Sequence, residues 1–213
     1  MTLYGRLAAA LLLAISSPLL AVGSTHVEKI RNDRVIVTEY VLDPQDSIAI
    51  EGRLPEARVY FADAAFEVTP QGGTPRSLTV KRGDVVFNMP QARTVKNAGS
   101  SEAHFFQVEV PGKGSKDSWG TTGLSPNYKM LFENAYARAY DIRIRAGAGE
   151  PQHTHHDRVV VCLSGAEVEH LFPDGHKEPS TLKTGEVAFR AGSTHIGHNI
   201  GKTDLWVIAI EPK

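Results

Sequence analysis

Residues 83–87 read GDVVF and residues 185–189 read GEVAF, so the same pattern returns after 102 positions. Each segment places a glycine and an acid directly before a short apolar run, which is typical of a turn that leads into a β-strand. The same shift aligns three further pairs, which are Asn32 with Asn134, Asn97 with Asn199, and Gly99 with Gly201. The chain therefore contains two halves that repeat one another.

Short runs rich in Val, Ile, Phe and Thr alternate with turns rich in Gly, Pro and Asp through both halves. Besides the strand after the Gly-acid pair, each half is expected to contain a first strand, a long strand and a last strand. Their predicted ranges are 34–41, 57–62 and 104–110 in the first half, and 137–145, 158–163 and 205–210 in the second. This spacing predicts an all-β fold with a closed antiparallel barrel or sandwich in each half.

The 213 residues carry a formal net charge of −1, with neither a basic stripe nor a long run of one charge. The sequence therefore lacks the electrostatic signature of a nucleic-acid binder. The one cysteine, Cys162, lies in the apolar run 159–163, so no internal disulfide can form. We expect Cys162 to be a small buried residue, with a metal ligand or a reactive thiol as the weaker alternatives.

Residues 1–23 have the pattern of a secretory signal peptide. Arg6 precedes an apolar run over 7–14, and the small residues Ala21 and Gly23 stand where a signal peptidase would cleave. The run is short for a membrane span and is followed by Ser and Pro. We expect a periplasmic or secreted mature protein without a membrane span, and an uncleaved N-terminal anchor is the alternative.

The repeat divides the remaining chain into a first barrel over 24–110, a linker over 111–130 and a second barrel over 131–213. The linker is rich in Gly and Ser and has little hydrophobic pattern. Trp119 and Tyr128 would be unusual in a fully solvated linker. The alternative is therefore that this segment packs across the seam between the barrels.

Five of the nine histidines fall in residues 152–157 (QHTHHD) and 194–199 (THIGHN). Residues two apart on a strand face the same side, so His153 and His155 point together while His156 points away. With His195 from a neighbouring strand, they would form a three-nitrogen metal site that leaves positions open for water or substrate. An HxH pattern by itself also occurs on a solvent-exposed surface strand, which is the alternative to a metal site.

The first half lacks these histidines. A shift of 100 places Arg53 and Pro55 opposite the HxH pair, and a shift of 102 places Arg93 opposite His195. Ligand-type residues in one copy only suggest a repeated scaffold with one working site and one lost site.

Four segments of the sequence match a known pattern. They are 131–138 (LFENAYAR), 153–161 (HTHHDRVVV), 185–189 together with Gly192, His195 and Asn199, and 199–211 at the end of the chain. The sequence thereby resembles the cupin superfamily over nearly its whole length, as a bicupin, and its second half is similar to small bacterial cupins. The resemblance implies two tandem double-stranded β-helix (jelly-roll) barrels, with metal ligands at His153, His155 and His195.

The usual cupin pattern also has a glutamate on the strand after the HxH pair. This sequence has Arg158 and Val159 at those positions, and Asp157 shares the parity of the histidine pair but stands early. Three neutral imidazoles would leave a divalent transition metal (Fe, Zn, Ni, Mn or Cu) its whole charge, which favours an anionic ligand at the open positions. Arg158 could steer such an anion, and its alternative is a structural ion pair with Asp157.

The remaining histidines have weaker claims. His198 is expected to support the site from behind the ligands or to lie on the surface, and His156 would become a ligand only if a bulge reversed the strand parity. His170 and His176 flank a predicted hairpin turn and are expected to be exposed. No carboxylate is evident as a general base, so a metal-bound hydroxide or His198 would have to serve.

Three functions are consistent with these patterns. The first is a metal-dependent enzyme, of the dioxygenase or isomerase type, that acts on a small anionic molecule. The second is a non-catalytic periplasmic protein that binds a small ligand, and the third is a structural cupin with a vestigial site. Exposed sheet edges would also allow a homodimer.

Overall fold

The computed structural model describes residues 23–119 and 124–213, and over these residues the fold is all-β with no helix. The predicted signal peptide lies outside the described residues, apart from Gly23. Within the described ranges, nothing is helical, long and apolar enough to cross a membrane. The predicted all-β class is thus confirmed.

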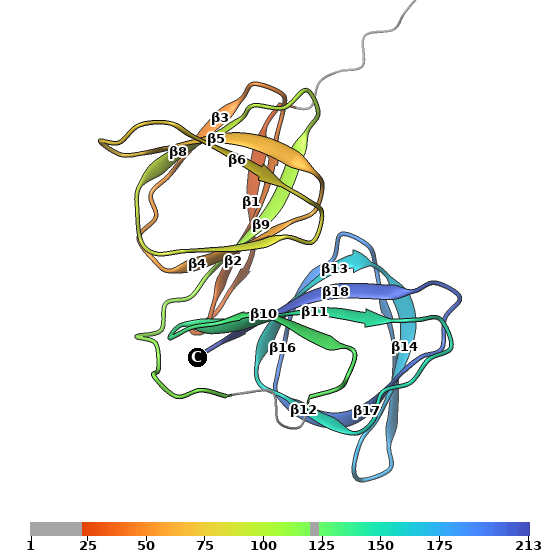
Figure 1. The fold of residues 1–213 in the computed structure, drawn as a ribbon. Coiled ribbons are helices and arrows are strands. Elements are labelled where there is room, and N and C mark those ends of the chain that lie inside the picture. Colours follow the sequence, from red (N-terminus) through yellow and green to blue (C-terminus); the bar gives the residue numbers. More distant parts are fainter. Residues whose placement is uncertain (1–22, 120–123) are drawn as a thin grey trace, which may run out of the picture.

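The first half forms a barrel of two sheets (Figure 1). The five-stranded sheet has the order β1-β2-β9-β4-β7, with β1 (Thr25–Arg31), β2 (Ile36–Leu42), β9 (Ala103–Glu109), β4 (Glu56–Tyr60) and β7 (Val85–Asn88). The four-stranded sheet has the order β3-β8-β5-β6, with β3 (Ser47–Ile50), β8 (Arg93–Asn97), β5 (Ala64–Pro70) and β6 (Arg76–Val80). Neighbouring strands in both sheets are antiparallel.

The second half repeats this topology strand for strand. Its five-stranded sheet has the order β10-β11-β18-β13-β16, with β10 (Tyr128–Glu133), β11 (Ala137–Ile144), β18 (Leu205–Pro212), β13 (Arg158–Ser164) and β16 (Val187–Arg190). Its four-stranded sheet has the order β12-β17-β14-β15, with β12 (His153–His155), β17 (Ser193–Asn199), β14 (Ala166–Leu171) and β15 (Lys177–Leu182). The predicted pair of jelly-roll barrels is therefore confirmed.

The Gly-acid pairs that revealed the repeat form equivalent turns before β7 and β16. Gly83 and Gly185 have φ values of 88° and 85°, a region that favours glycine. The acid after each glycine then accepts the backbone N–H three residues earlier, so that Asp84 binds the N–H of Lys81 as Glu186 binds that of Lys183. The repeated residues are thus the ones that make the turns.

The repeated asparagines brace a second pair of turns. The buried Asn97 donates from Nδ2 to the carbonyl oxygens of Leu42 and Ser101. In the second barrel, Asn199 donates to the carbonyl oxygens of Ile144 and Thr203. These side chains satisfy backbone groups that would otherwise be buried without partners, which explains why both halves have kept them.

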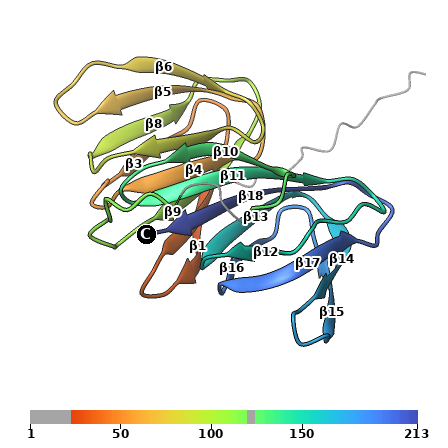
Figure 2. The same cartoon turned by 60° about the horizontal axis from the view of Figure 1, so that its bottom comes forward.

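One apolar core joins the two barrels, which lie against each other in both views (Figure 2). Alternate residues of β13 point to opposite faces of the sheet. Val159, Val161 and Leu163 face this shared core, while Val160 and Cys162 face the interior of the second barrel. The first barrel contributes its own alternate residues to the shared core, which are Val35, Val37, Ala57, Val59, Phe106, Val108 and Val110. The central strands of the two five-stranded sheets, β4, β9, β13 and β18, are therefore buried on both faces, and the first barrel completes the core of the second.

Cys162 is buried, as predicted, and burial raises the pKa of its thiol to about 11. Such a thiol stays protonated at neutral pH, where the thiolate is the reactive form. Cys162 is thus a small core residue.

Several strands were not predicted from the sequence, among them β1 and β10. Strand β1 precedes the predicted first strand, and β10 begins at Tyr128, inside the predicted linker, where it pairs with β11. Trp119 in the same segment stacks on His156, with ring centroids 3.8 Å apart. Aromatic residues therefore fasten this part of the chain to the second barrel, whereas the alternative interpretation placed it across the seam between the barrels.

The close approach of Gly83 to the second barrel provides a stability test. A Cβ on Gly83 would lie 2.4 Å from Trp206. A Cβ on Gly72, which has a similar φ of 72°, would meet nothing within 4 Å. We expect Gly72→Ala to cost about 1 kcal/mol of unfolding free energy for backbone strain alone, and Gly83→Ala about 3 kcal/mol because the two barrels must also separate. Chemical denaturation measures both, and equal costs would contradict this role of Gly83.

Candidate metal centre and ligand pocket

Strands β12 and β17 bring the three predicted ligands together. His153 and His155 stand on the inward face of β12, and His195 lies directly opposite His153 on β17. All three are buried, and one nitrogen atom from each lies within 4.8 Å of the other two. Alternation along an extended strand produces this convergence, because Thr154 between the two histidines must point outward.

Hydrogen bonds orient the imidazoles. The Nδ1 atom of His153 lies 2.8 Å from the carbonyl oxygen of Pro151, which can only accept, so Nδ1 carries the proton and Nε2 presents a lone pair. The Nδ1 atom of His195 lies 3.2 Å from the hydroxyl oxygen of Ser193. The Nε2 atoms of His153 and His155 are 3.0 Å apart. This donor set fits a transition-metal ion, because such ligands are usually fixed by a hydrogen bond from the second ring nitrogen.

The environment keeps two of the imidazoles neutral. Burial lowers the pKa of His195 to about 3, with further contributions from His170, His153 and Arg158. Burial, and next the positive charge of Arg158, lowers the pKa of His155 far below its usual range. Neutral imidazoles are the form that binds metal ions, so His155 and His195 need no deprotonation to bind one at neutral pH.

Two buried carboxylates lie beside the histidines, although the sequence had revealed none. The Oε2 atom of Glu150 is 3.9 Å from Nε2 of His153, and Oε1 of Glu211 is 3.9 Å from Nδ1 of His155. Gly197 makes room for the first, since a Cβ there would lie 2.8 Å from Oε2 of Glu150. No carboxylate was evident in the sequence as a general base, and the structure brings these two close to the predicted ligands.

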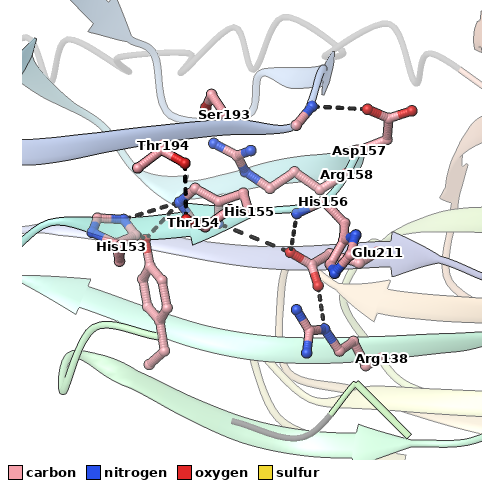
Figure 3. Close-up of polar contacts among 12 residues, drawn as sticks. Arg138, His153, Thr154, His155, His156, Asp157, Arg158, Ser193, Thr194 and Glu211 are labelled. Atoms are coloured by element: carbon pink, nitrogen blue, oxygen red, sulfur yellow. Dashed lines mark hydrogen bonds and ion pairs between the residues drawn. The ribbon is translucent and has the colours of Figure 1, made fainter. Parts of the chain in front are cut away.

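Glu211 connects the HxH strand to the central strand β18. It is fully buried, accepts a hydrogen bond from Nε of Arg138, and lies 3.3 Å from the backbone N–H of His156 (Figure 3). A buried carboxylate needs such partners because removing its charge from water is costly. The glutamate that the usual cupin pattern has after the HxH pair is absent, as the sequence indicated, and the last strand supplies a carboxylate behind the ligands. Glu211 stands at an inward-facing position of β18, and this strand alternation is the feature of the sequence that could have revealed it.

The phenol of Tyr128 also reaches the cluster. Its oxygen lies 3.1 Å from Nε2 of His153 and 3.2 Å from Nε2 of His155. Burial, and next the negative charge of Glu150, raises the pKa of this phenol well above its usual value. The sequence analysis had placed Tyr128 in a linker and had given it no role.

His170 corrects another expectation. It is half-buried on β14, and its ring centroid is 4.3 Å from that of His195. Burial lowers its pKa, with Arg158 as the next cause. The prediction of an exposed hairpin position holds for His176 and was wrong for His170, because the hairpin folds its inward face over the histidine cluster.

The other predicted residues lie around the site. His156 points away from the pair and stacks on Trp119. Asp157 accepts a hydrogen bond of 2.8 Å from the backbone N–H of Gly192 (Figure 3) and thus braces a turn. His198 is exposed, with Nε2 3.1 Å from the carbonyl oxygen of Gly147. Its parity on β17 is opposite to that of His195, so it is badly placed as a base.

Arg158 is buried next to the histidines instead of pairing with Asp157. Its Nη1 atom makes one long hydrogen bond, 3.4 Å, to the carbonyl oxygen of Ala191, and it forms no ion pair with a described residue. Arg190 stands directly opposite it on β16 and also lines the pocket. Burial lowers the pKa of Arg158 and Arg190 adds to this effect, whereas Tyr128, Glu211 and Glu150 act in the opposite direction. Two like charges opposite each other on a sheet repel.

These groups border a cavity of about 310 Å³ inside the second barrel. Its polar end contains Tyr128, Glu150, His155, Arg158, His170 and His195. The remaining wall is largely apolar, with Ile142, Ile144, Val160, Val168, Leu182, Leu205 and Val207. An apolar cavity with a few convergent polar groups is typical of a small-molecule site.

The first barrel closes the equivalent place with ion pairs. Strand pairing puts Ile50 opposite Arg93, so Ile50 and not Arg53 is the counterpart of His153. The buried Glu56 binds Nε of Arg58 at 2.8 Å and also receives a hydrogen bond from Arg93. A change of register in this loop misled the alignment of the halves. The lost site is thus filled by side chains.

The sequence matches no protein-family model and no curated protein. In structure, the chain is similar to AerE from Microcystis aeruginosa, with 13% identity and a TM-score of 0.66 over 92% of this chain and 95% of that one. A single-residue variant of Bacillus subtilis oxalate decarboxylase is similar at 13% identity and a TM-score of 0.65, over 89% of this chain and 73% of that one. A cupin 2 conserved barrel domain protein from Leptotrichia buccalis is similar at 13% identity and a TM-score of 0.57, over 93% and 92%.

The fold is that of a bicupin. Identities this low establish the architecture and leave the activity open. In this bicupin, only the second barrel has a three-histidine group among the residues described.

The depressed histidine pKa values make the stability of the metal-free bicupin depend on pH. Below about pH 6.5, His155 and His195 bind protons in the unfolded chain but not in the native state. The free energy of unfolding therefore falls as the pH falls toward the native pKa of His195, which is about 3. His195→Gln should make the free energy of unfolding depend less steeply on pH, by up to about 1.4 kcal/mol per pH unit between about pH 6 and pH 4.5. Urea denaturation in chelator measures this. The exposed His176→Gln is the control, and equal slopes in parent and His195→Gln would refute the assignment.

Proposed function

We propose that the second barrel is a metal-dependent enzyme site, in which His153, His155 and His195 hold one divalent transition-metal ion and Arg158 holds a small anionic substrate beside it. The ion would polarise a bound carboxylate or water molecule. Support for the metal comes from three buried, convergent imidazoles. A structural neighbour, the oxalate decarboxylase of Bacillus subtilis, has Mn(II) centres.

The main support for an anionic substrate comes from the environment of Arg158. The buried guanidinium of Arg158 has one long hydrogen bond and a second arginine opposite, so its remaining N–H groups lack acceptors among the described residues, although the carboxylates of Glu211 and Glu150 favour its charge. An anion in the cavity would relieve the repulsion and supply acceptors for the unused N–H groups. The apolar wall accommodates a compact carbon skeleton, so the proposed substrate is a small carboxylate.

Two groups at the polar end can carry protons. Glu150 is buried against His153, and His170 lies against His195, so both face the place where a metal-bound substrate would lie. They replace His198 as the candidates for the general base. A proton-transfer reaction of the isomerase type therefore has more support than a dioxygenation, for which these groups are not required.

Export and pairing of two copies stay predictions. We propose export because of the pattern in residues 1–23, and because the single buried cysteine makes folding independent of the redox state of the compartment. The terminal strands β6 and β15 are sheet edges through which a homodimer could form.

Metal content tests the proposal first. The mature protein, purified without a histidine tag, should contain close to one transition-metal ion per chain by mass spectrometry. The His153→Ala/His195→Ala double variant should contain almost none, whereas a His176→Ala/His198→Ala variant, which removes two exposed imidazoles, should retain it. A parent protein that stays metal-free after reloading would refute the proposed site.

The role of Arg158 is tested by carboxylate binding to the metal-loaded protein. Arg158→Gln should weaken the binding of acetate, oxalate or benzoate by about 10- to 100-fold, because charge-assisted hydrogen bonds are lost. Arg53→Gln, which alters an exposed arginine paired with Glu51, should leave the affinity unchanged. Calorimetric titration measures both. Equal affinities in the Arg158→Gln protein and its parent would remove Arg158 from the site.

A further inference from the structure

We propose that Tyr128 is a fourth protein ligand of the metal ion, so that the site is a three-histidine, one-phenolate centre. This inference rests on the proposed metal binding at His153, His155 and His195. It assigns a ligand from β10, outside both sequence segments that supply the histidines.

The distances among three atoms support coordination. The Tyr128 oxygen is 3.1 Å from Nε2 of His153 and 3.2 Å from Nε2 of His155, and the two nitrogens are 3.0 Å apart. The three atoms thus form a nearly equilateral triangle. Neighbouring ligands of an octahedral ion with bonds of about 2.1–2.2 Å are separated by about 3.0–3.1 Å, so the triangle has the size of one octahedral face.

Hydrogen bonding alone explains the triangle less well. The phenol has one proton and can donate it to only one of the two nitrogens. Because Nδ1 of His153 donates to Pro151, the Nε2 lone pair of His153 faces into the triangle, toward a second nitrogen at 3.0 Å. A cation at the centre would satisfy all three donor atoms at once.

The fold holds the Tyr128 ring in this position. Its backbone pairs with Ile142 of β11, and its ring centroid lies 5.4 Å from the rings of both His153 and His155 and 6.0 Å from that of Tyr140. A ring packed on three sides loses little further entropy when it binds an ion, so the ligand is pre-organised.

Coordination changes the charge of the site in a defined way. When the ion binds, the phenol O–H bond breaks, the oxygen keeps the electron pair for the metal, and the proton leaves to solvent. A divalent ion with three neutral imidazoles and one phenolate then has a net charge of +1. The remaining charge still attracts one carboxylate, in agreement with a small anionic substrate.

The test uses the mature protein loaded with ferric ion alone. Phenolate bound to ferric ion gives a charge-transfer absorption band in the visible range, which imidazole ligands do not. We expect this band in the parent and its loss in Tyr128→Phe, together with an affinity for the ion that is weaker by about tenfold or more.

Tyr140→Phe is the matched control. Tyr140 packs beside Tyr128, and its buried hydroxyl has no hydrogen-bond partner among the described residues. This variant should keep the band and the affinity, and thermal unfolding of the metal-free proteins checks that both variants fold.

The outcomes separate this inference from the proposed function. One bound ion without a visible band in the parent would overturn the role of Tyr128 and leave the three-histidine site intact. A parent that binds no ion would overturn both. A band that survives in Tyr128→Phe would also refute the assignment.

Discussion

The apolar face shared by the two five-stranded sheets is the constraint on which the rest of the structure depends. It is built from alternate residues of strands in both barrels, such as Val59, Phe106, Val161 and Ile210. Because these strands are buried on both faces, their other residues are also fixed, and they form the interior of each barrel. The wall of the cavity is thus positioned by contacts with a different barrel, which explains why the first barrel persists without ligand residues.

The two barrels share one scaffold but differ in how side chains occupy the polar end. In the first barrel, Arg58 and Arg93 converge on Glu56, and the ion pairs fill the space that a ligand would need. In the second, the Arg138–Glu211 pair lies behind the HxH strand, so the space in front of it stays open. A buried ion pair rarely adds much stability over an apolar replacement, but removing one partner is costly.

The second barrel combines features that favour anions. A positively charged guanidinium, Arg158, occupies the position where the cupin resemblance leads one to expect a ligand carboxylate. The carboxylates that do occur, Glu150 and Glu211, approach the histidines from other elements. Two of the imidazoles are held neutral, and the cavity beside them combines Arg158 and Arg190 with a largely apolar wall. The proposed small carboxylate would find a partner in both parts of the cavity.

The sequence by itself determined the repeat, the all-β class, the turns at Gly83 and Gly185, and the convergence of His153 and His155, because these follow from local backbone geometry and strand alternation. Tertiary structure decided the rest. Tyr128, His170 and Glu211 reach the site from three separate strands, and no local spacing relates them to the histidines, whereas Glu150 stands three residues before His153 in the loop that leads into β12. Closure of the barrel brings them together, since its strand order joins segments that are distant along the chain.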